Sequence, residues 1–170
     1  VADTNTWRVA GERVAELLSA SGVAVKPYIL CKDGTYFHAE YKWIDELREA
    51  YLKESDRPTI VAVGSGTIND LCKRMAEEVG ERYVVIGTAA SMDGYTSFGA
   101  AITKDGMKQT LSCKAPLGCL IDTEIAAQAP AEMAASGYAD LIAKLPAGAD
   151  WMLADLIGSE KIHPIAWKLV

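Results

Sequence analysis

The chain has 170 residues, of which 50% are hydrophobic and 24% are charged, so it can bury the core of one domain, or of one domain and part of another. Its net charge of −6, without a basic stripe, argues against nucleic acid as the main partner. No apolar run reaches membrane-spanning length and no signal-peptide pattern is present, so we expect a cytoplasmic protein without a membrane span.

The four cysteines, Cys31, Cys72, Cys113 and Cys119, are widely spaced and form no C-x-x-C pair. This spacing predicts reduced, mostly buried thiols in a cytoplasmic protein. A zinc finger is a poor interpretation of it, and no motif supports a nucleophilic role for any of the four thiols.

The first predicted elements alternate between helix and strand. Residues 4–21 favour a helix that Gly22 can end, and residues 23–31, which are rich in Val and Ile, favour a strand. Residues 38–53 predict a second helix. Its apolar face would hold Ile44, Leu47, Tyr51 and Leu52.

The alternation continues with a strand over residues 59–63, which is apolar on both of its faces and therefore predicts burial on both sides. A helix follows, which Gly80 stops, and residues 83–86 predict another buried strand. The apolar stripe of this helix would hold Leu71, Cys72, Met75 and Val79. Such alternation predicts a parallel sheet with helices on its faces.

The pattern changes after Gly94. Asp105-Gly106 is a strong signal for a two-residue hairpin turn, and one more strand ends near Asp122. From about Ala129 the sequence is rich in Ala, Leu and Met and has no strand signal. We therefore expect a Rossmann-like α/β domain over residues 1–128, with an added β-hairpin, and the beginning of an all-α domain over residues 129–170.

A glycine-rich loop, Gly64-Ser65-Gly66, follows the strand over residues 59–63. In α/β folds ligands bind at the carboxyl ends of parallel strands, where a helix N-terminus directs free N–H groups at a phosphate. The loop is neither the usual dinucleotide fingerprint, since Asn69 stands where a third glycine belongs, nor a P-loop. These residues alone leave phosphate binding and a tight turn without a ligand equally open.

A second polar loop follows the next strand, in the segment GTAASMDGYTS of residues 87–97. It would lie beside the glycine loop at the same edge of the sheet, which favours a cleft for a polar ligand, although Ser and Thr also cap ordinary solvated turns. Its polar residues are Thr88, Ser91, Asp93, Thr96 and Ser97.

Asp140 is followed by Leu141 and Ile142 on what we expect to be a buried helix. A buried carboxylate is costly unless it is paired or binds a metal. Pairing with Lys144, one turn later, is the simpler interpretation.

Together these segments resemble the iron-containing alcohol dehydrogenase and glycerol dehydrogenase superfamily, which also includes dehydroquinate synthases. Its G-G-G-x-x-x-D loop is similar to GSGTIND at residues 64–70, and its T-x-x-S-x-D segment to TAASMD at residues 88–93. Its A-P before the helical domain and the G-x-x-D-x-x-x-K pattern that opens this domain are similar to Ala129-Pro130 and to residues 137–144. SMDG and ADWMLAD resemble the glycerol-1-phosphate dehydrogenase branch. The resemblance covers nearly the whole chain, in order.

The resemblance implies a role for each matched residue. The pyrophosphate of NAD or NADP would lie on Gly64, Ser65, Gly66 and Thr67, and Asp70 would close that loop. The nicotinamide side would be lined by Thr88, Ser91 and Ser97, with Asp93 as the catalytic residue near the substrate. Asp3 would take the adenosine ribose hydroxyls, and this acid favours NAD over NADP because it would repel a 2′-phosphate. Asp140 would be the first metal ligand.

Two departures from the family pattern are present. Ser65 replaces the middle glycine of the loop, which is tolerable if its φ is negative. The family completes its metal site with two downstream histidines, whereas the only histidines here, His38 and His163, lie in the wrong context. We therefore expect a central piece of a longer enzyme, without the start of the nucleotide-binding domain and most of the metal-binding domain.

The activity that the resemblance implies is reversible reduction of dihydroxyacetone phosphate to sn-glycerol 1-phosphate, with NAD(P) and a divalent metal, zinc before nickel or iron. A small phosphorylated polyol would be the substrate, and the enzyme would be a homo-oligomer. The alternatives are another polyol or glycerol dehydrogenase, a dehydroquinate synthase-like enzyme, and a nucleotide-binding fragment without catalysis.

Overall fold

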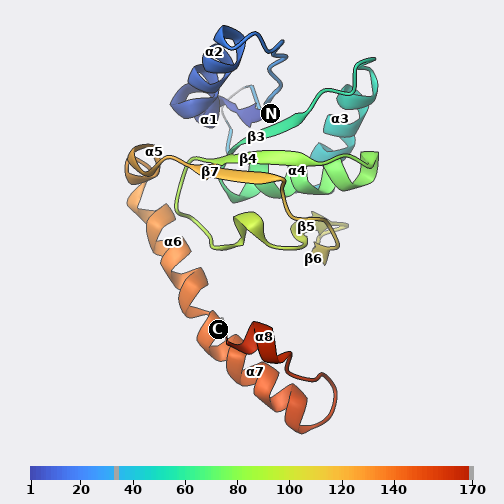
Figure 1. Ribbon diagram of the computed structural model, residues 1–170, viewed down its shortest axis with the longest axis vertical. Helices are drawn as coiled ribbons and strands as arrows, with labels where there is room; N and C mark the ends of the chain where they lie inside the picture. Colours follow the sequence, from blue (N-terminus) through green and yellow to red (C-terminus); the bar gives the residue numbers. More distant parts are fainter. Residues whose placement is uncertain (33–34, 169–170) are drawn as a thin grey trace.

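The centre of the molecule is a parallel β-sheet, shown in Figure 1 of this computed structural model, which describes residues 1–32 and 35–168. Backbone hydrogen bonds from Val1 to Val61 and from Val63 to Val1 join its two parts, so the strand order is β2-β1-β3-β4-β7. The strands are β1 (Ala2–Asp3), β2 (Ile29–Leu30), β3 (Ile60–Gly64), β4 (Tyr83–Gly87) and β7 (Gly118–Ile121).

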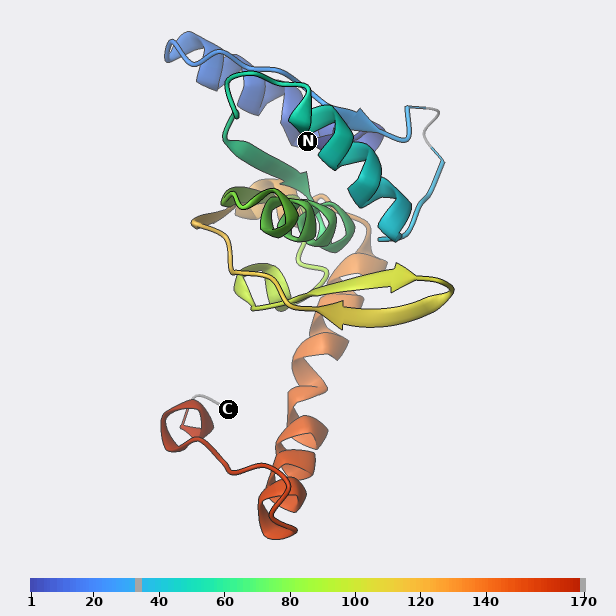
Figure 2. The same cartoon turned by 90° about the vertical axis from the view of Figure 1, so that its right-hand side faces the viewer.

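Helices cover both faces of this sheet, as the alternation predicts (Figures 1 and 2). One face packs against α3 (Tyr41–Leu52) and α4 (Gly66–Val79), and the other against the helical segment from Thr4 to Ala20. That segment consists of α1 (Thr4–Thr6), a π-helix η1 (Trp7–Gly11) and α2 (Glu12–Ala20).

The residues of β3 divide between the two faces because side chains alternate along a strand. Ile60 and Ala62 belong to the larger apolar cluster with α3 and α4, while Val63 belongs to the smaller cluster with Ala2 and Ala10. The stripe predicted for α4 is confirmed, since Leu71, Cys72 and Met75 are buried and Val79 packs against them.

A polar contact inside the larger cluster joins α4 to β4. Asn69 and Tyr83 are both buried, and the Tyr83 hydroxyl donates to Asn69 Oδ1 at 2.9 Å. Asn69, which replaces the third glycine of a dinucleotide fingerprint, therefore has a partner that fixes α4 on the sheet.

The predicted hairpin is present as β5 (Ala100–Lys104) and β6 (Met107–Leu111), which pair antiparallel. Its turn residues Asp105 and Gly106 both have positive φ, as a two-residue hairpin turn requires. Figure 2 shows the hairpin beside α4, on the side away from the sheet, and its residues Ala100 and Ile102 extend the larger apolar cluster.

Two details of the first half differ from the prediction. The strand expected over residues 23–31 shortens to β2, because Pro27 has no backbone N–H for a ladder and β1, its partner strand, has only two residues. Leu52, expected on the buried face of α3, is 62% exposed, whereas Ile44, Leu47 and Tyr51 are buried.

The last part of the chain extends away from the sheet as a helical arm (Figure 1). It consists of α5 (Thr123–Ala127), α6 (Ala131–Ile142), α7 (Lys144–Leu156) and α8 (Pro164–Trp167). The break between α6 and α7 lies at Ala143, where Pro146 cannot donate a backbone N–H to the carbonyl four residues earlier. Among the described residues no helix is long and apolar enough to cross a membrane.

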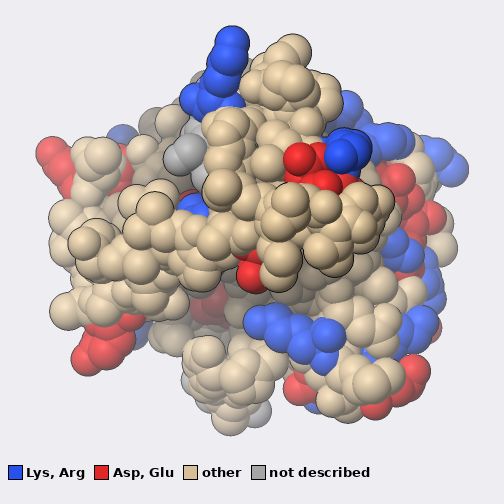
Figure 3. Space-filling view, turned by 90° about the horizontal axis from the view of Figure 1, so that it is seen from below, with Lys and Arg blue, Asp and Glu red and all other residues tan. Residues whose placement is uncertain are grey.

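The expectation that Asp140 lies on a buried helix is wrong. Helix α6 has no buried residue, and Leu141 and Ile142 are about half exposed. Apolar character in this segment does not produce burial because the arm stands clear of the sheet. Figure 3 views this end of the molecule from below and shows largely uncharged surface.

One point of α6 approaches the body of the domain very closely. A Cβ added to Gly137 would lie 2.1 Å from the carbonyl oxygen of Ala90. Only glycine allows this approach, which brings α6 onto the loop after β4.

Gly137→Ala is expected to push α6 away from that loop. Alanine in a helix normally adds about 1 kcal/mol of stability over glycine, but here the contact with Ala90 opposes this gain. We expect the free energy of unfolding to fall and amide exchange at Asp93, which donates to Asp140, to become faster. Gly118→Ala is the control, since its nearest neighbour would be 4.0 Å away. A more stable protein with unchanged exchange at Asp93 would contradict the prediction.

Tyr83→Phe is expected to destabilise the protein by about 1–3 kcal/mol, because it leaves Asn69 Oδ1 buried without its donor. Urea-induced unfolding would measure the change. The matched control is Tyr36→Phe, at a side chain that is 85% exposed, and equal stability of the two variants would show that the buried hydrogen bond contributes nothing.

Candidate functional site

The strand order places a topological switch point between β1 and β3. The chain passes from β1 outward to β2, then returns across β1 to β3 and continues to β4 and β7. In open α/β sheets the crevice at such a point, outside the carboxyl ends of the strands, is where ligands bind. Asp3 ends β1 and Gly64 ends β3, so the sheet brings these two predicted site residues to neighbouring strand ends.

The glycine loop is extended rather than left-handed. Ser65 has φ of −93°, so serine in place of the middle glycine introduces no backbone strain. A Cβ on Gly64 would lie 2.7 Å from Ile68, and one on Gly66 would lie 3.1 Å from Met92 Sδ. Close approach of α4 and of the second loop, rather than positive φ, therefore explains the two glycines.

The N-terminus of α4 begins at this loop with its first amides uncapped. The first hydrogen bond of the helix is donated by Asn69 to the Ser65 carbonyl, and the Ser65 side chain does not cap the helix. The N–H groups of Gly66, Thr67 and Ile68 thus have no partner within the helix. Such a group of amides at the positive end of a 14-residue helix can bind a phosphate.

The second predicted loop lies directly beside the first. Gly64 and Gly87 are paired in register, and the Thr88 amide donates to the Gly64 carbonyl at 3.2 Å. Thr88 is buried at this edge. The structure therefore brings the glycine loop and the hydroxyl-rich loop together, as their positions after adjacent strands predict.

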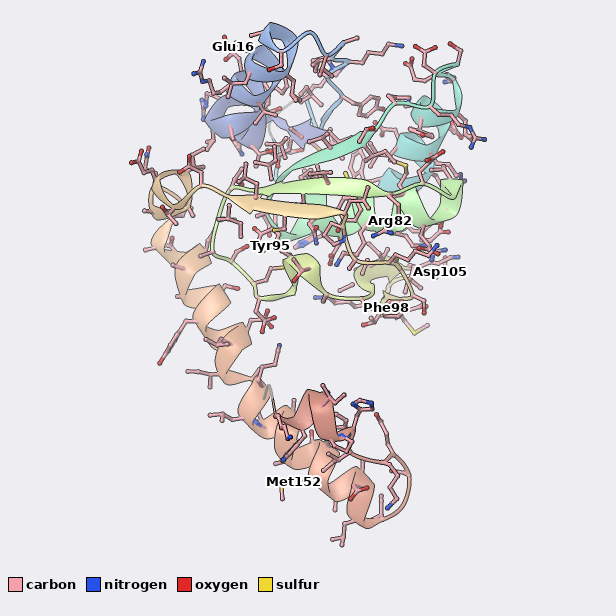
Figure 4. All side chains as sticks on the ribbon, in the orientation of Figure 1. Glu16, Arg82, Tyr95, Phe98, Asp105 and Met152 are labelled. Atoms are coloured by element: carbon pink, nitrogen blue, oxygen red, sulfur yellow. The ribbon has the colours of Figure 1, made fainter. Side chains whose placement is uncertain are left out.

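Tyr95 anchors the second loop from below the sheet (Figure 4). Its hydroxyl donates to the Ala89 carbonyl at 2.7 Å, and its ring would lie 3.2 Å from a Cβ on Gly87. Burial raises the pKa of Tyr95, and the neighbouring side chain of Ser91 lowers it.

Asp3 acts as the N-cap of α1. Its Oδ1 accepts from the amides of Asn5 at 2.8 Å and Thr6 at 2.9 Å, while no described residue donates to Oδ2. A ligand hydroxyl could therefore approach Oδ2 without displacing the cap.

Asp70 and Ser97 have partners on the hairpin side of α4 rather than at the glycine loop. Asp70 Oδ2 accepts from the Ala101 amide at 3.1 Å. Burial raises the pKa of this carboxyl, although the hydrogen bond with Ala101 lowers it in part. The Ser97 hydroxyl donates to the Gly94 carbonyl at 2.8 Å. These contacts give both residues structural roles, and their predicted contacts with a cofactor remain predictions.

Asp93 and Asp140 meet where α6 contacts the second loop. The Asp93 amide donates to Asp140 Oδ2 at 3.0 Å, and this hydrogen bond is the main reason that the pKa of Asp140 is lowered. Lys144 Nζ lies 3.0 Å from Asp93 Oδ2 and 3.9 Å from Asp140 Oδ1, and the hydrogen bond with Asp93 raises the pKa of Lys144. The expected pairing of Asp140 with Lys144 is thus present, but Lys144 lies closer to Asp93.

The metal-binding potential of this cluster is limited to carboxylates. The side chain of Asp140 is 41% exposed, and its Oδ1 lies 3.9 Å from Lys144 Nζ. Within residues 1–32 and 35–168 no group of three or more His, Cys, Asp and Glu side chains could hold a metal ion. One carboxylate ligand therefore fits, while a three-ligand site of the kind that catalytic zinc uses does not.

One hollow of the molecule lies away from this edge of the sheet. A cavity of about 690 Å³ is lined by residues around β2 and α3, including Tyr28, Phe37 and Trp43. The candidate site is instead an open edge of the sheet, formed by three strand ends and the start of α4. Sequence reasoning missed Met92, which contacts Gly66, and Lys73, which is buried under the second loop.

Residues 1–130 match the family model of the iron-containing alcohol dehydrogenases. Over 99% of its length the chain is 35% identical to a glycerol-1-phosphate dehydrogenase [NAD(P)+] of Halalkalibacterium halodurans, of which it covers 42%. It is 32% identical to the enzymes of that name from Bacillus subtilis and Methanosarcina mazei, covering 43% of each. The chain thus spans less than half the length of the curated relatives it matches.

Solved structures show the same fold. A glycerol dehydrogenase from Schizosaccharomyces pombe has a TM-score of 0.68 at 27% identity, over 83% of this chain and 35% of that one. An iron-containing alcohol dehydrogenase from Thermotoga maritima has a TM-score of 0.69 at 15% identity, over 82% of this chain and 44% of that one. With the family model matching residues 1–130, the chain belongs to the iron-containing alcohol dehydrogenase family.

Proposed function

We propose that the protein containing this chain is an NAD(P)-dependent, metal-dependent dehydrogenase that interconverts dihydroxyacetone phosphate and sn-glycerol 1-phosphate. The similarity to relatives named glycerol-1-phosphate dehydrogenase [NAD(P)+], which extends over 94–100% of this chain, supports the substrate class. The observation that carries the cofactor half of the proposal is the uncapped N-terminus of α4 at the switch point, between Asp3 and Thr88.

In this proposal the amides of Gly66, Thr67 and Ile68 hold the cofactor pyrophosphate, and Gly64 and Ser65 let the backbone approach it. Asp3 Oδ2 accepts from ribose hydroxyls, and its negative charge favours NAD over NADP because a 2′-phosphate would be repelled. The bound nicotinamide supplies the hydride that the reduction of a ketone requires. Thr88, Ser91 and Ser97 line that half of the cofactor.

Asp140 is the proposed metal ligand, and Asp93 the catalytic residue beside it, since the two lie in direct contact. When bound, a divalent metal supplies a Lewis acid for the substrate oxygen. The ligands that Asp140 needs besides itself would come from outside this chain, because the described residues hold no complete set. Zinc is proposed before nickel or iron, as the resemblance to the family implies.

The same proposal covers the organisation of the protein. Residues 1–128 are the nucleotide-binding domain and residues 129–170 begin a helical metal-binding domain, which agrees with an arm whose apolar side chains are largely exposed. We expect a cytoplasmic homo-oligomer that acts on a small phosphorylated polyol.

A glycerol or other polyol dehydrogenase is the alternative that a specific observation favours, because the Schizosaccharomyces pombe structure shares 27% identity. The two candidates differ in one chemical group, the substrate phosphate. A dehydroquinate synthase-like reaction and nucleotide binding without catalysis are outcomes of the same test.

The full-length protein is expected to oxidise NADH with dihydroxyacetone phosphate in the presence of Zn²⁺ or Ni²⁺, and to lose this activity after EDTA. An enantioselective enzymatic assay of the product should identify sn-glycerol 1-phosphate rather than the 3-phosphate. Turnover of glycerol or dihydroxyacetone instead would support the alternative. A full-length protein that binds NADH without turning over any of these substrates would contradict the proposed activity.

Asp140→Asn is expected to reduce the metal content of the purified protein and to lower kcat by about a hundredfold or more, because it removes a charged ligand while keeping the side-chain volume. Metal content by mass spectrometry reports the loss independently of activity. The control is Asp150→Asn, an exposed aspartate of α7. Equal metal content in both variants would exclude Asp140 as a ligand.

A further inference from the structure

Lys73 is a buried cation beneath the second loop. It lies in the second turn of α4 and is 1% exposed, although lysine is almost never fully buried in proteins without a partner. The sequence does not mark it, since its neighbours Cys72 and Met75 belong to the apolar stripe of the helix.

The Lys73 ammonium is surrounded by oxygen acceptors from a single segment. It donates to the carbonyl oxygens of Ser97 at 2.9 Å, Gly99 at 3.1 Å and Gly94 at 3.4 Å, and lies 3.5 Å from Ser97 Oγ. An ammonium can donate to all three carbonyls, whereas a neutral amine has only two N–H groups, so the geometry favours the protonated form even though burial lowers the pKa of Lys73. Three backbone carbonyls are thus gathered around one charge.

A second side chain of α4, Asp70, also binds this part of the chain. Asp70 Oδ2 accepts from the Ala101 amide at 3.1 Å. Asp70 and Lys73 are also the charged groups that face each other here, and Cys113 is the further titratable group near Lys73. Together they fasten residues 94–101 to α4 by charge-assisted hydrogen bonds, which are stronger than neutral ones.

Residues 94–99 connect to one half of the proposed cofactor site and are bound to the helix that carries the other half. Residues 94–99 begin directly after Asp93 and follow the loop with Thr88 and Ser91, whereas α4 begins at the glycine loop. One rigid helix therefore bears the proposed pyrophosphate site at its first turn and, at its second turn, the cation that holds the other proposed half of the site.

We propose that Lys73 is a positioning residue, which fixes residues 94–99 relative to the N-terminus of α4 and so sets the spacing between the two halves of the cofactor site. This inference rests on the proposed NAD(P) function. It assigns Lys73 no contact with substrate or cofactor, because its three strongest acceptors are all protein carbonyls.

The test compares three variants of the full-length protein. Lys73→Gln removes the charge, Lys73→Arg keeps the charge with a different shape, and Lys114→Gln makes the same change as the first at an exposed lysine. For each protein, amide hydrogen exchange of residues 94–101, the Kd for NADH from its fluorescence, and the free energy of unfolding in urea would be measured.

We expect Lys73→Gln to accelerate exchange in residues 94–101 and to weaken NADH binding by about tenfold or more, since three carbonyls, of which that of Gly99 is buried, lose a charged donor. Lys73→Arg should give a smaller effect in the same direction, and Lys114→Gln should match the wild type. If Lys73→Gln does not fold, the comparison of Lys73→Arg with the wild type carries the test, with faster local exchange at unchanged global stability as the expected result.

A Lys73→Gln protein that is less stable overall, but keeps the wild-type Kd for NADH and shows no local acceleration of exchange, would overturn the inference, because Lys73 would then be only a core residue. A wild-type protein that binds no NADH would contradict the proposed function instead. In that case unchanged exchange in residues 94–101 of the variant would overturn the positioning role as well.

Discussion

The in-register pairing of β3 with β4 is the constraint on which the candidate site depends. Both strands end at glycines, Gly64 and Gly87, which are partners in the sheet, and the Thr88 amide continues the ladder to the Gly64 carbonyl. Two loops that are separate in the sequence therefore start from the same point. A slip of one residue would turn every side chain of one strand to the opposite face, so burial on both faces protects this alignment.

Helix α4 is the second element that the site requires. Its orientation is fixed by three sets of contacts. Leu71, Cys72 and Met75 bury its apolar stripe, and Asn69 binds the Tyr83 hydroxyl of β4. Asp70 and Lys73 attach it to the segment that leads into the hairpin. A helix held in this way presents its first amides in a fixed direction, which lowers the cost of ordering a bound phosphate.

The acidic cluster depends on a different kind of contact. Asp140 reaches Asp93 only because Gly137 lets α6 approach the Ala90 carbonyl, in an arm that otherwise stands away from the sheet. Lys144 lies 3.0 Å from Asp93 Oδ2 and 3.9 Å from Asp140 Oδ1, so its positive charge offsets part of the charge of the two carboxylates. The proposed metal ligand thus lies at a junction between the body and the arm.

Local sequence patterns determined the order and type of the elements, the parallel sheet with its added hairpin, and the meeting of the loops after β3 and β4. The spacing of apolar residues, the turn residues and the β-branched runs can all be seen in residues that are close in sequence. This is why the Asp105-Gly106 turn and the α4 stripe could be predicted. Only the tertiary structure decided that β2 has two residues, that α6 is exposed, and that Lys73 is buried among carbonyls. These outcomes depend on partners far away in the sequence, and a residue's own pattern carries no record of which distant groups will surround it.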